Sequence, residues 1–153
     1  MAVTEDTYGG EAVKNLLNLL KEKGIVREEV RVDSHSVGGK DNVVSTKTAK
    51  IVQTSLAKGF DVVLILVDSD REEPEDVRMR VLEFLRGKQG IDLEMMRVVV
   101  FRPNIERLLA PDADDPISYL NAQWGYKNEY KKGDLPKFIP RVDLNAARRL
   151  PCF

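Results

Sequence analysis

The stretch FDVVLILVDSDREEP, residues 60–74, decides the fold. Residues 62–67 form an unbroken apolar run rich in β-branched side chains, with Gly59 before it and a group of acids after it. Such a run is typical of a strand that helices cover on both faces, so we interpret it as the central strand of a sheet. Pro74 favours the first turn of a helix and therefore marks the start of the next element.

Strand and helix patterns alternate outward from this segment. Amphipathic spacing with glycine stops predicts helices, and β-branched or apolar runs predict strands. In chain order we expect a short strand at residues 1–5, a helix at 9–24, a shorter exposed strand at 26–36, a helix at 43–59 capped by Asp41 or Asn42, the central strand at 62–67, a helix from 74, a strand at 95–101 and a short helix at 103–112. This alternation predicts a Rossmann-like α/β fold, with helices flanking a mostly parallel four-stranded sheet. If the strand order is 2-1-3-4, strands one and three are neighbours.

The chain has 153 residues, a length that suits one folding unit. We expect the α/β domain to span residues 1–110. Residues 111–153 are proline-punctuated and weakly periodic, so we expect a helical and irregular C-terminal extension packed on the same domain.

Composition narrows the function classes. The 24 basic and 25 acidic residues nearly balance, so any nucleic-acid contact has to come from a local patch. The single cysteine, Cys152, excludes an internal disulfide framework and a cysteine-cluster zinc site. The N-terminal residues show no secretory signal pattern and no apolar run is long enough to span a bilayer, so we expect a cytoplasmic protein that does not bind membranes.

Acidic residues gather where the predicted strands end. In a parallel sheet of this order, strands one and three are neighbours, and ligands bind outside their carboxyl ends. Glu5 and Asp6 follow the first strand, and Asp68 and Asp70 follow the third. Crowded carboxylates either acquire a raised pKa or bind a cation, and magnesium prefers hard oxygen ligands. The pattern therefore predicts a site for Mg²⁺, or for Mn²⁺ in its place.

A purely structural interpretation competes with this one, because aspartate is common where a strand turns toward a helix. Pro74 sets the start of the next helix, so Asp68 and Asp70 lie too far upstream to cap it. The four later acids fit a helix dipole or a solvated face. Glu106, which opens the helix after the fourth strand, is a secondary acidic candidate together with Asp6, although an ordinary first-turn acid explains it equally well.

These residues together resemble a known family. A strand that ends in glutamate (MAVTED), a glycine-containing turn and helix (YGGEAVKNLL), and an apolar strand that ends in Asp-x-Asp (VVLILVDSD) look like the topoisomerase-primase, or Toprim, domain over residues 1–110. The stretches FRPNIERLLAPD and YKNEYKKGDLPKF are similar to small stand-alone Toprim-like proteins related to phage-defence nucleases. The resemblance implies that Glu5 is a general acid or base or a metal ligand, and that Asp68 and Asp70 hold magnesium. Family members carry a glycine directly after the glutamate, whereas this chain has Asp6 there and glycines only at positions 9 and 10.

Several basic residues are candidates for contact with nucleic acid. Lysines interleaved with aromatic residues suit a strand-binding patch, because bases stack on rings while lysines neutralise phosphates. The candidates of this kind are Lys127, Lys131 and Lys132, among Trp124, Tyr126 and Tyr130. A packed tail with solvated lysines is the alternative. Lys40 in the GGK turn could meet a phosphate, and Arg71 either contacts nucleic acid or neutralises the nearby acids.

Three functions fit this set of residues. The leading hypothesis is a magnesium-dependent phosphoryl-transfer or nuclease domain of Toprim type that acts on nucleic acid phosphodiesters. The second is a non-catalytic module of the same fold that binds nucleic acid or a protein partner. The third is a receiver-like domain with Asp68 as phosphoacceptor, although the lysine expected at the end of a fifth strand has no clear counterpart.

Overall fold

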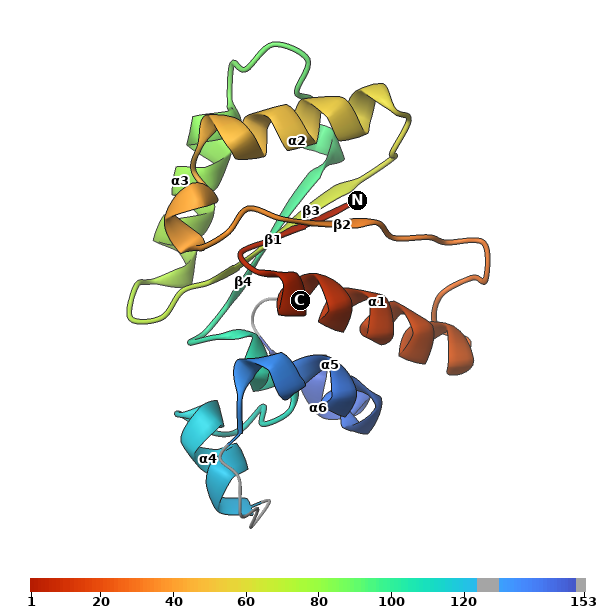
Figure 1. Ribbon diagram of the computed structural model, residues 1–153, viewed down its shortest axis with the longest axis vertical. Helices are drawn as coiled ribbons and strands as arrows, with labels where there is room; N and C mark the ends of the chain where they lie inside the picture. The colour runs from red at the N-terminus through yellow and green to blue at the C-terminus, as the bar shows by residue number, and fades with distance from the viewer. Residues whose placement is uncertain (124–129, 151–153) are drawn as a thin grey trace.

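A computed structural model describes residues 1–123 and 130–150 of the chain. Its centre is a four-stranded parallel sheet, as the sequence predicts, with the strands in the order β2-β1-β3-β4 (Figure 1). The strands are β1 (Ala2–Thr4), β2 (Ser34–Ser36), β3 (Val63–Asp68) and β4 (Met96–Phe101). In the parallel register, Thr4 at the end of β1 lies opposite Leu66 of β3, and Asp68 lies opposite Phe101 of β4.

Helices cover both faces of the sheet. α2 (Thr46–Ala57) and α3 (Pro74–Leu85) lie on one face, and α1 (Thr7–Glu22) lies on the other, where the C-terminal helices join it (Figure 1). Successive side chains of β3 therefore point to opposite faces of the sheet and pack in two different hydrophobic cores. Ile65 packs in the core under α2 and α3, whereas Leu66 packs in the core shared with α1. This covering of both faces explains the continuous apolar run.

The helix starts follow capping chemistry. The side chain of Asp6 accepts a hydrogen bond from Gly9 N and caps α1, and α3 begins at Pro74 as predicted. The expectation that Asp41 or Asn42 caps α2 is wrong. Ser45 caps this helix, because its extended backbone lets the hydroxyl accept from Thr48 N, while residues 40–42 form a 3₁₀ turn, η1 (Lys40–Asn42).

Two expected elements are shorter than the pattern suggests. In the exposed segment 26–36, only Ser34–Ser36 pairs with β1, and residues 26–33 form no strand. The helix expected at 103–112 is a 3₁₀ turn, η3 (Ile105–Leu108). A further 3₁₀ turn, η2 (Leu93–Met95), leads into β4.

Short helices make up the C-terminal region. They are α4 (Pro116–Gln123), η4 (Lys132–Asp134), α5 (Leu135–Phe138), η5 (Ile139–Arg141) and α6 (Leu144–Ala147). Leu135 and Ile139 are fully buried against the core that includes Ala12 and Leu19 of α1. This packing brings η4 to the carboxyl edge of the sheet, next to the start of α1. Among the described residues, no helix is long and apolar enough to cross a membrane.

Candidate acidic site at the carboxyl edge of the sheet

Glu5 and Asp68 meet at the carboxyl ends of β1 and β3. Glu5 Oε1 accepts a hydrogen bond from the backbone N–H of Asp68 at 2.7 Å. The carboxylate of Asp68 is buried, and its Oδ1 accepts a hydrogen bond from Ile105 N at 2.9 Å. Asp68 therefore has a structural role that the sequence does not reveal, because it holds the start of η3 rather than the start of α3.

Burial sets the protonation of both carboxyl groups. It raises the pKa of Asp68 to about 7; the nearby carboxylates of Glu5 and Glu106 add to the rise, while Lys132 opposes it. Burial is also the largest cause of the raised pKa of Glu5, against which the hydrogen bond from Asp68 N and the charge of Lys132 act. Both groups can thus change protonation closer to neutral pH than ordinary surface acids do.

Lys132 is the cation of this site. Its Nζ lies 3.2 Å from Asp6 Oδ2 and 3.3 Å from Asp68 Oδ2. Burial acts to lower the pKa of Lys132, but the carboxylates of Asp68 and Asp6 outweigh it and hold this pKa above its usual range. The ammonium group therefore stays charged and neutralises Asp68, a predicted metal ligand, and Asp6, a secondary acidic candidate.

Glu106 lies behind this group in the interior. Only 1% of its surface is exposed, and its Oε1 accepts a hydrogen bond from the hydroxyl of Tyr130 at 3.2 Å. Burial, followed by the charge of Glu106 and this hydrogen bond, raises the pKa of Tyr130, so the hydroxyl remains a donor. An ordinary first-turn acid would be exposed, so the burial of Glu106 favours a specific role.

The side chain of Asp70 is exposed, unlike the buried side chain of Asp68. The Asp70 backbone has φ of 54°, in the left-handed region, and the side chain is 61% exposed. Lys40 Nζ lies 2.9 Å from Asp70 Oδ2 and 3.1 Å from Glu72 Oε1, and it donates a hydrogen bond to Ser69 O. Lys40 is thus engaged with acids of the β3–α3 loop, and Asp70 forms part of this outer ion-pair cluster.

Of the other predicted basic residues, Arg71 and Lys131 form no hydrogen bond or ion pair with the buried acids Asp68 and Glu106. Arg71 and Lys131 are exposed. Lys127 lies outside the described residues, as do its neighbours Trp124 and Tyr126. Of the interleaved lysines and aromatic residues, Lys132 and Tyr130 therefore face the acidic site, which their sequence pattern did not indicate.

The space at the site is small. Glu5, Asp6, Asp68 and Lys132 line a hollow of about 20 Å³, close to the volume that one water molecule needs. Within residues 1–123 and 130–150, no group of three or more His, Cys, Asp or Glu side chains is arranged to hold a metal ion. The carboxylate oxygens of Glu5 and Asp68 suit magnesium chemically, but in this conformation Lys132 supplies the positive charge.

Sequence reasoning missed the groups that complete this site. Lys132 Nζ and Tyr130 Oη reach it from the C-terminal region, and Ile105 contributes a backbone N–H. No local spacing connects residues 64 positions apart, such as Lys132 and Asp68. Comparison of the chain with protein-family models, with curated proteins and with solved structures finds no match in any of the three.

Proposed function

We propose that the chain is a Toprim-like domain that carries out magnesium-dependent phosphoryl transfer on nucleic acid phosphodiesters. The observation that carries this proposal is the convergence of Glu5 and Asp68, both with raised pKa, at the edge where neighbouring parallel strands end. Ligands bind at such an edge in open α/β sheets, and a carboxyl group with a raised pKa suits proton transfer.

The side chains of the acidic site have different roles in the proposed reaction. Glu5 and Asp68 hold Mg²⁺ or Mn²⁺, which often binds through one or two carboxylates and completes its shell with water and substrate phosphate. The metal supplies charge stabilisation at the phosphate. In cleavage, Glu5 would take the proton of the attacking water, the bond from phosphorus to the leaving oxygen would break, and that oxygen would take up a proton from solvent. Lys132 would exchange its contact with Asp68 for a phosphate oxygen when substrate enters. Asp70, with Lys40 and Arg71, lies on the outer side of the same edge, where a nucleic acid backbone would pass.

A second candidate is a non-catalytic module that binds nucleic acid or a protein. It draws support from Lys132, whose ammonium already lies 3.2 Å from Asp6 and 3.3 Å from Asp68 and leaves a hollow of only about 20 Å³. In that case the acids and Lys132 form a permanent ion-pair network that fixes η4 to the sheet. The exposed Lys131 and Arg71 then provide the contacts.

The receiver-like alternative has weaker support. The sheet of the described residues has four strands, and the lysine near Asp68 comes from a 3₁₀ turn rather than from the end of a fifth strand. Labelling of Asp68 by acetyl phosphate, absent in Asp68→Asn, is the observation that would favour it.

One experiment separates the first two functions. Nicking of plasmid and single-stranded DNA and RNA is measured with Mg²⁺, Mn²⁺ or EDTA for the wild type, Glu5→Gln and Asp68→Asn. Asp61→Asn, at the amino end of the same sheet, is the matched control. The proposal expects metal-dependent cleavage that both site variants lose and the control keeps. Binding of nucleic acid without cleavage supports the second candidate, and cleavage that survives in Asp68→Asn contradicts the first.

A further inference from the structure

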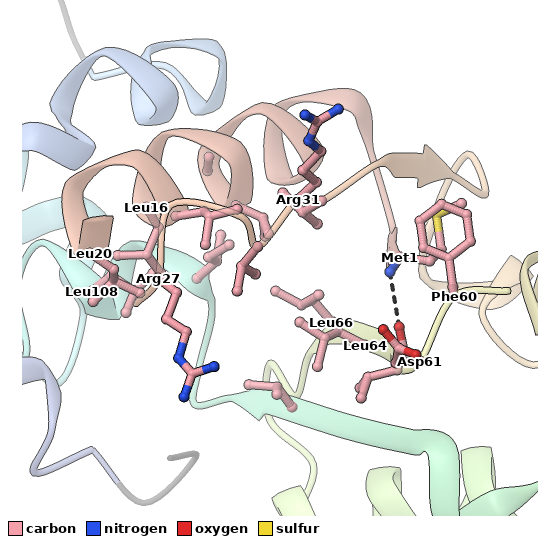
Figure 2. Close-up of a pocket in the computed structure, with 18 of the residues that line it drawn as sticks. Met1, Leu16, Leu20, Arg27, Arg31, Phe60, Asp61, Leu64, Leu66 and Leu108 are labelled. Carbon is pink, nitrogen blue, oxygen red and sulfur yellow. Dashed lines mark hydrogen bonds between the residues drawn. The ribbon is translucent and has the colours of Figure 1, made fainter. Parts of the chain in front are cut away.

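A large apolar groove lies on the α1 face of the sheet and shares Leu66, Phe101 and Ile105 with the lining of the acidic hollow. It has a volume of about 870 Å³ and is open along one side. Figure 2 shows Leu16 and Leu20 of α1, Leu64 and Leu66 of β3, and Leu108 around it. Leu66 and Leu108 are buried at its floor, whereas Leu16, Leu20 and Leu64 remain partly exposed.

The arrangement of helices explains why this face is uncovered. α2 and α3 together cover the opposite face, but α1 contacts β1 and β2 and the C-terminal helices α5 and η5. Leu64 of β3 and Val99 of β4 pack against the core cluster that includes residues of α1, but both side chains are only partly buried. A sheet of this kind usually has helices across both faces, so α1 covers this part of the sheet incompletely.

The rim of the groove favours a macromolecule as the occupant. Val30 and Val62 line the groove with 44% and 40% of their surface exposed. A small amphipathic ligand in the groove would leave these rim residues in water. A protein surface would cover the groove and the rim together, and exposed apolar patches of this type mark protein interaction sites.

The charges on the rim favour a second copy of this chain. Arg27, Glu29 and Arg31 line the groove, and none of their side chains forms a hydrogen bond or ion pair with another described residue. The side chains of Arg27 and Arg31 extend in opposite directions (Figure 2). A twofold dimer brings one patch against the same patch, so the patch must complement itself. A patch with unpaired charges of both signs, a groove and protruding valines meets this requirement.

We propose that the chain forms a symmetric dimer through this groove, with Val30 and Val62 of each copy inserted against the apolar floor of the other. Glu29 of each copy finds an arginine partner, Arg27 or Arg31, on the other copy across the twofold axis. The proposal does not depend on the function of the acidic site, because the contacts that it invokes, Val30 and Val62, line the groove and not the acidic hollow.

Sedimentation velocity of the full chain across a wide range of concentration tests the proposal. Val30→Glu and Val62→Glu each place a charge at the expected contact, and Met79→Glu on α3 is the control, because Met79 is similarly exposed at 39% on the other face. We expect a wild-type dimer, a dissociation constant raised about a hundredfold or more by each rim variant, and no change from the control. Circular dichroism melting establishes that all variants fold.

Three results would overturn the proposal. The wild type could sediment as a monomer at every concentration. It could form a dimer that both rim variants keep, which would assign the dimer to another surface. Finally, native mass spectrometry could find a monomer that carries an amphipathic small molecule, which would assign the groove to that ligand.

Discussion

The side chain of Glu5 and the backbone N–H of Asp68 are joined by a hydrogen bond of 2.7 Å across 63 residues of sequence. Because β1 and β3 are parallel neighbours, Thr4 lies opposite Leu66 and the next residue, Glu5, reaches past the end of the shorter strand. The same carboxylate that the proposed function needs thus also closes the edge of the sheet.

Replacement of Glu5 separates these two roles. Glu5→Ala leaves the N–H of Asp68 without its acceptor and should lower the free energy of unfolding by about 1–3 kcal/mol. Glu5→Gln keeps a carbonyl oxygen at this position and should cost less than about 1 kcal/mol. Urea unfolding at neutral pH measures both values. Equal losses in the two variants would show that the charge, and not the hydrogen bond, stabilises this edge.

The raised pKa of Asp68 makes stability depend on pH. Its carboxyl group has a pKa of about 7 in the folded chain against an ordinary value of 3.8, so the folded state holds the proton more strongly. This contribution is fully present below about pH 4 and is lost as the pH rises through 7. The difference in unfolding free energy between wild type and Asp68→Asn should fall by up to about 4 kcal/mol over this window.

Asp68→Asn is a suitable reference for this measurement, because asparagine keeps an oxygen that can accept from Ile105 N. Glu5 and the remaining titrating groups are common to both proteins and largely cancel in the difference. A difference that stays constant from pH 4 to pH 8 would contradict the raised pKa.

Much of the fold follows from local pattern, whereas the complete site does not. The run at residues 62–67 predicts a strand buried on both faces, because its pattern lies within one segment. The alternation of strands and helices predicts a parallel sheet, whereas the strand order depends on contacts between segments. The ends of β1 and β3 then identify Glu5 and Asp68. Lys132 and Tyr130 reach the site only through the packing of Leu135 and Ile139 on α1, and no sequence period encodes that contact.

Close packing at the start of α1 predicts a specific cost for Gly10→Ala. A Cβ at position 10 would lie 2.8 Å from Ser34 Oγ and 3.0 Å from Ser34 Cβ, so α1 and β2 would have to separate. We expect a loss of about 1–3 kcal/mol in thermal or urea unfolding, despite the better helix propensity of alanine. Gly9→Ala is the matched control, because its nearest contacts are 3.4 Å away.

The same steric argument gives a rescue. Ser34→Gly removes both clashing atoms, so the double variant with Gly10→Ala should be more stable than Gly10→Ala alone. A double variant that loses the sum of the two single effects would show that the separation of α1 and β2 is not the cause.

The buried Glu106 should depend on Tyr130 for its stability. Tyr130→Phe removes the hydroxyl that donates to Glu106 Oε1 at 3.2 Å and should cost about 1–3 kcal/mol, because a carboxylate with 1% exposure loses a donor. In the background of Glu106→Leu the same change should cost much less. A double-mutant cycle measured by urea unfolding gives the coupling, and a coupling near zero would contradict the assignment of this pair.

We expect the acidic site to require a cation, so removal of Lys132 should lower the stability of the folded chain. Lys132→Ala leaves Asp6 and Asp68 without the ammonium group that lies 3.2 and 3.3 Å away. The Lys132 side chain is 41% exposed, so solvent screening limits the loss to about 1–2 kcal/mol, and the loss should be larger above pH 7, where Asp68 is ionised. Lys137→Ala is the control, because its pair with Asp134 is exposed and should contribute less than about 1 kcal/mol.

If Lys132 holds the position of a metal, millimolar Mg²⁺ should raise the melting temperature of Lys132→Ala more than that of the wild type or of the control. An equal response of all three proteins to Mg²⁺ would mean that the carboxylates around Lys132 do not attract a divalent cation, and the magnesium-dependent function would lose its structural basis.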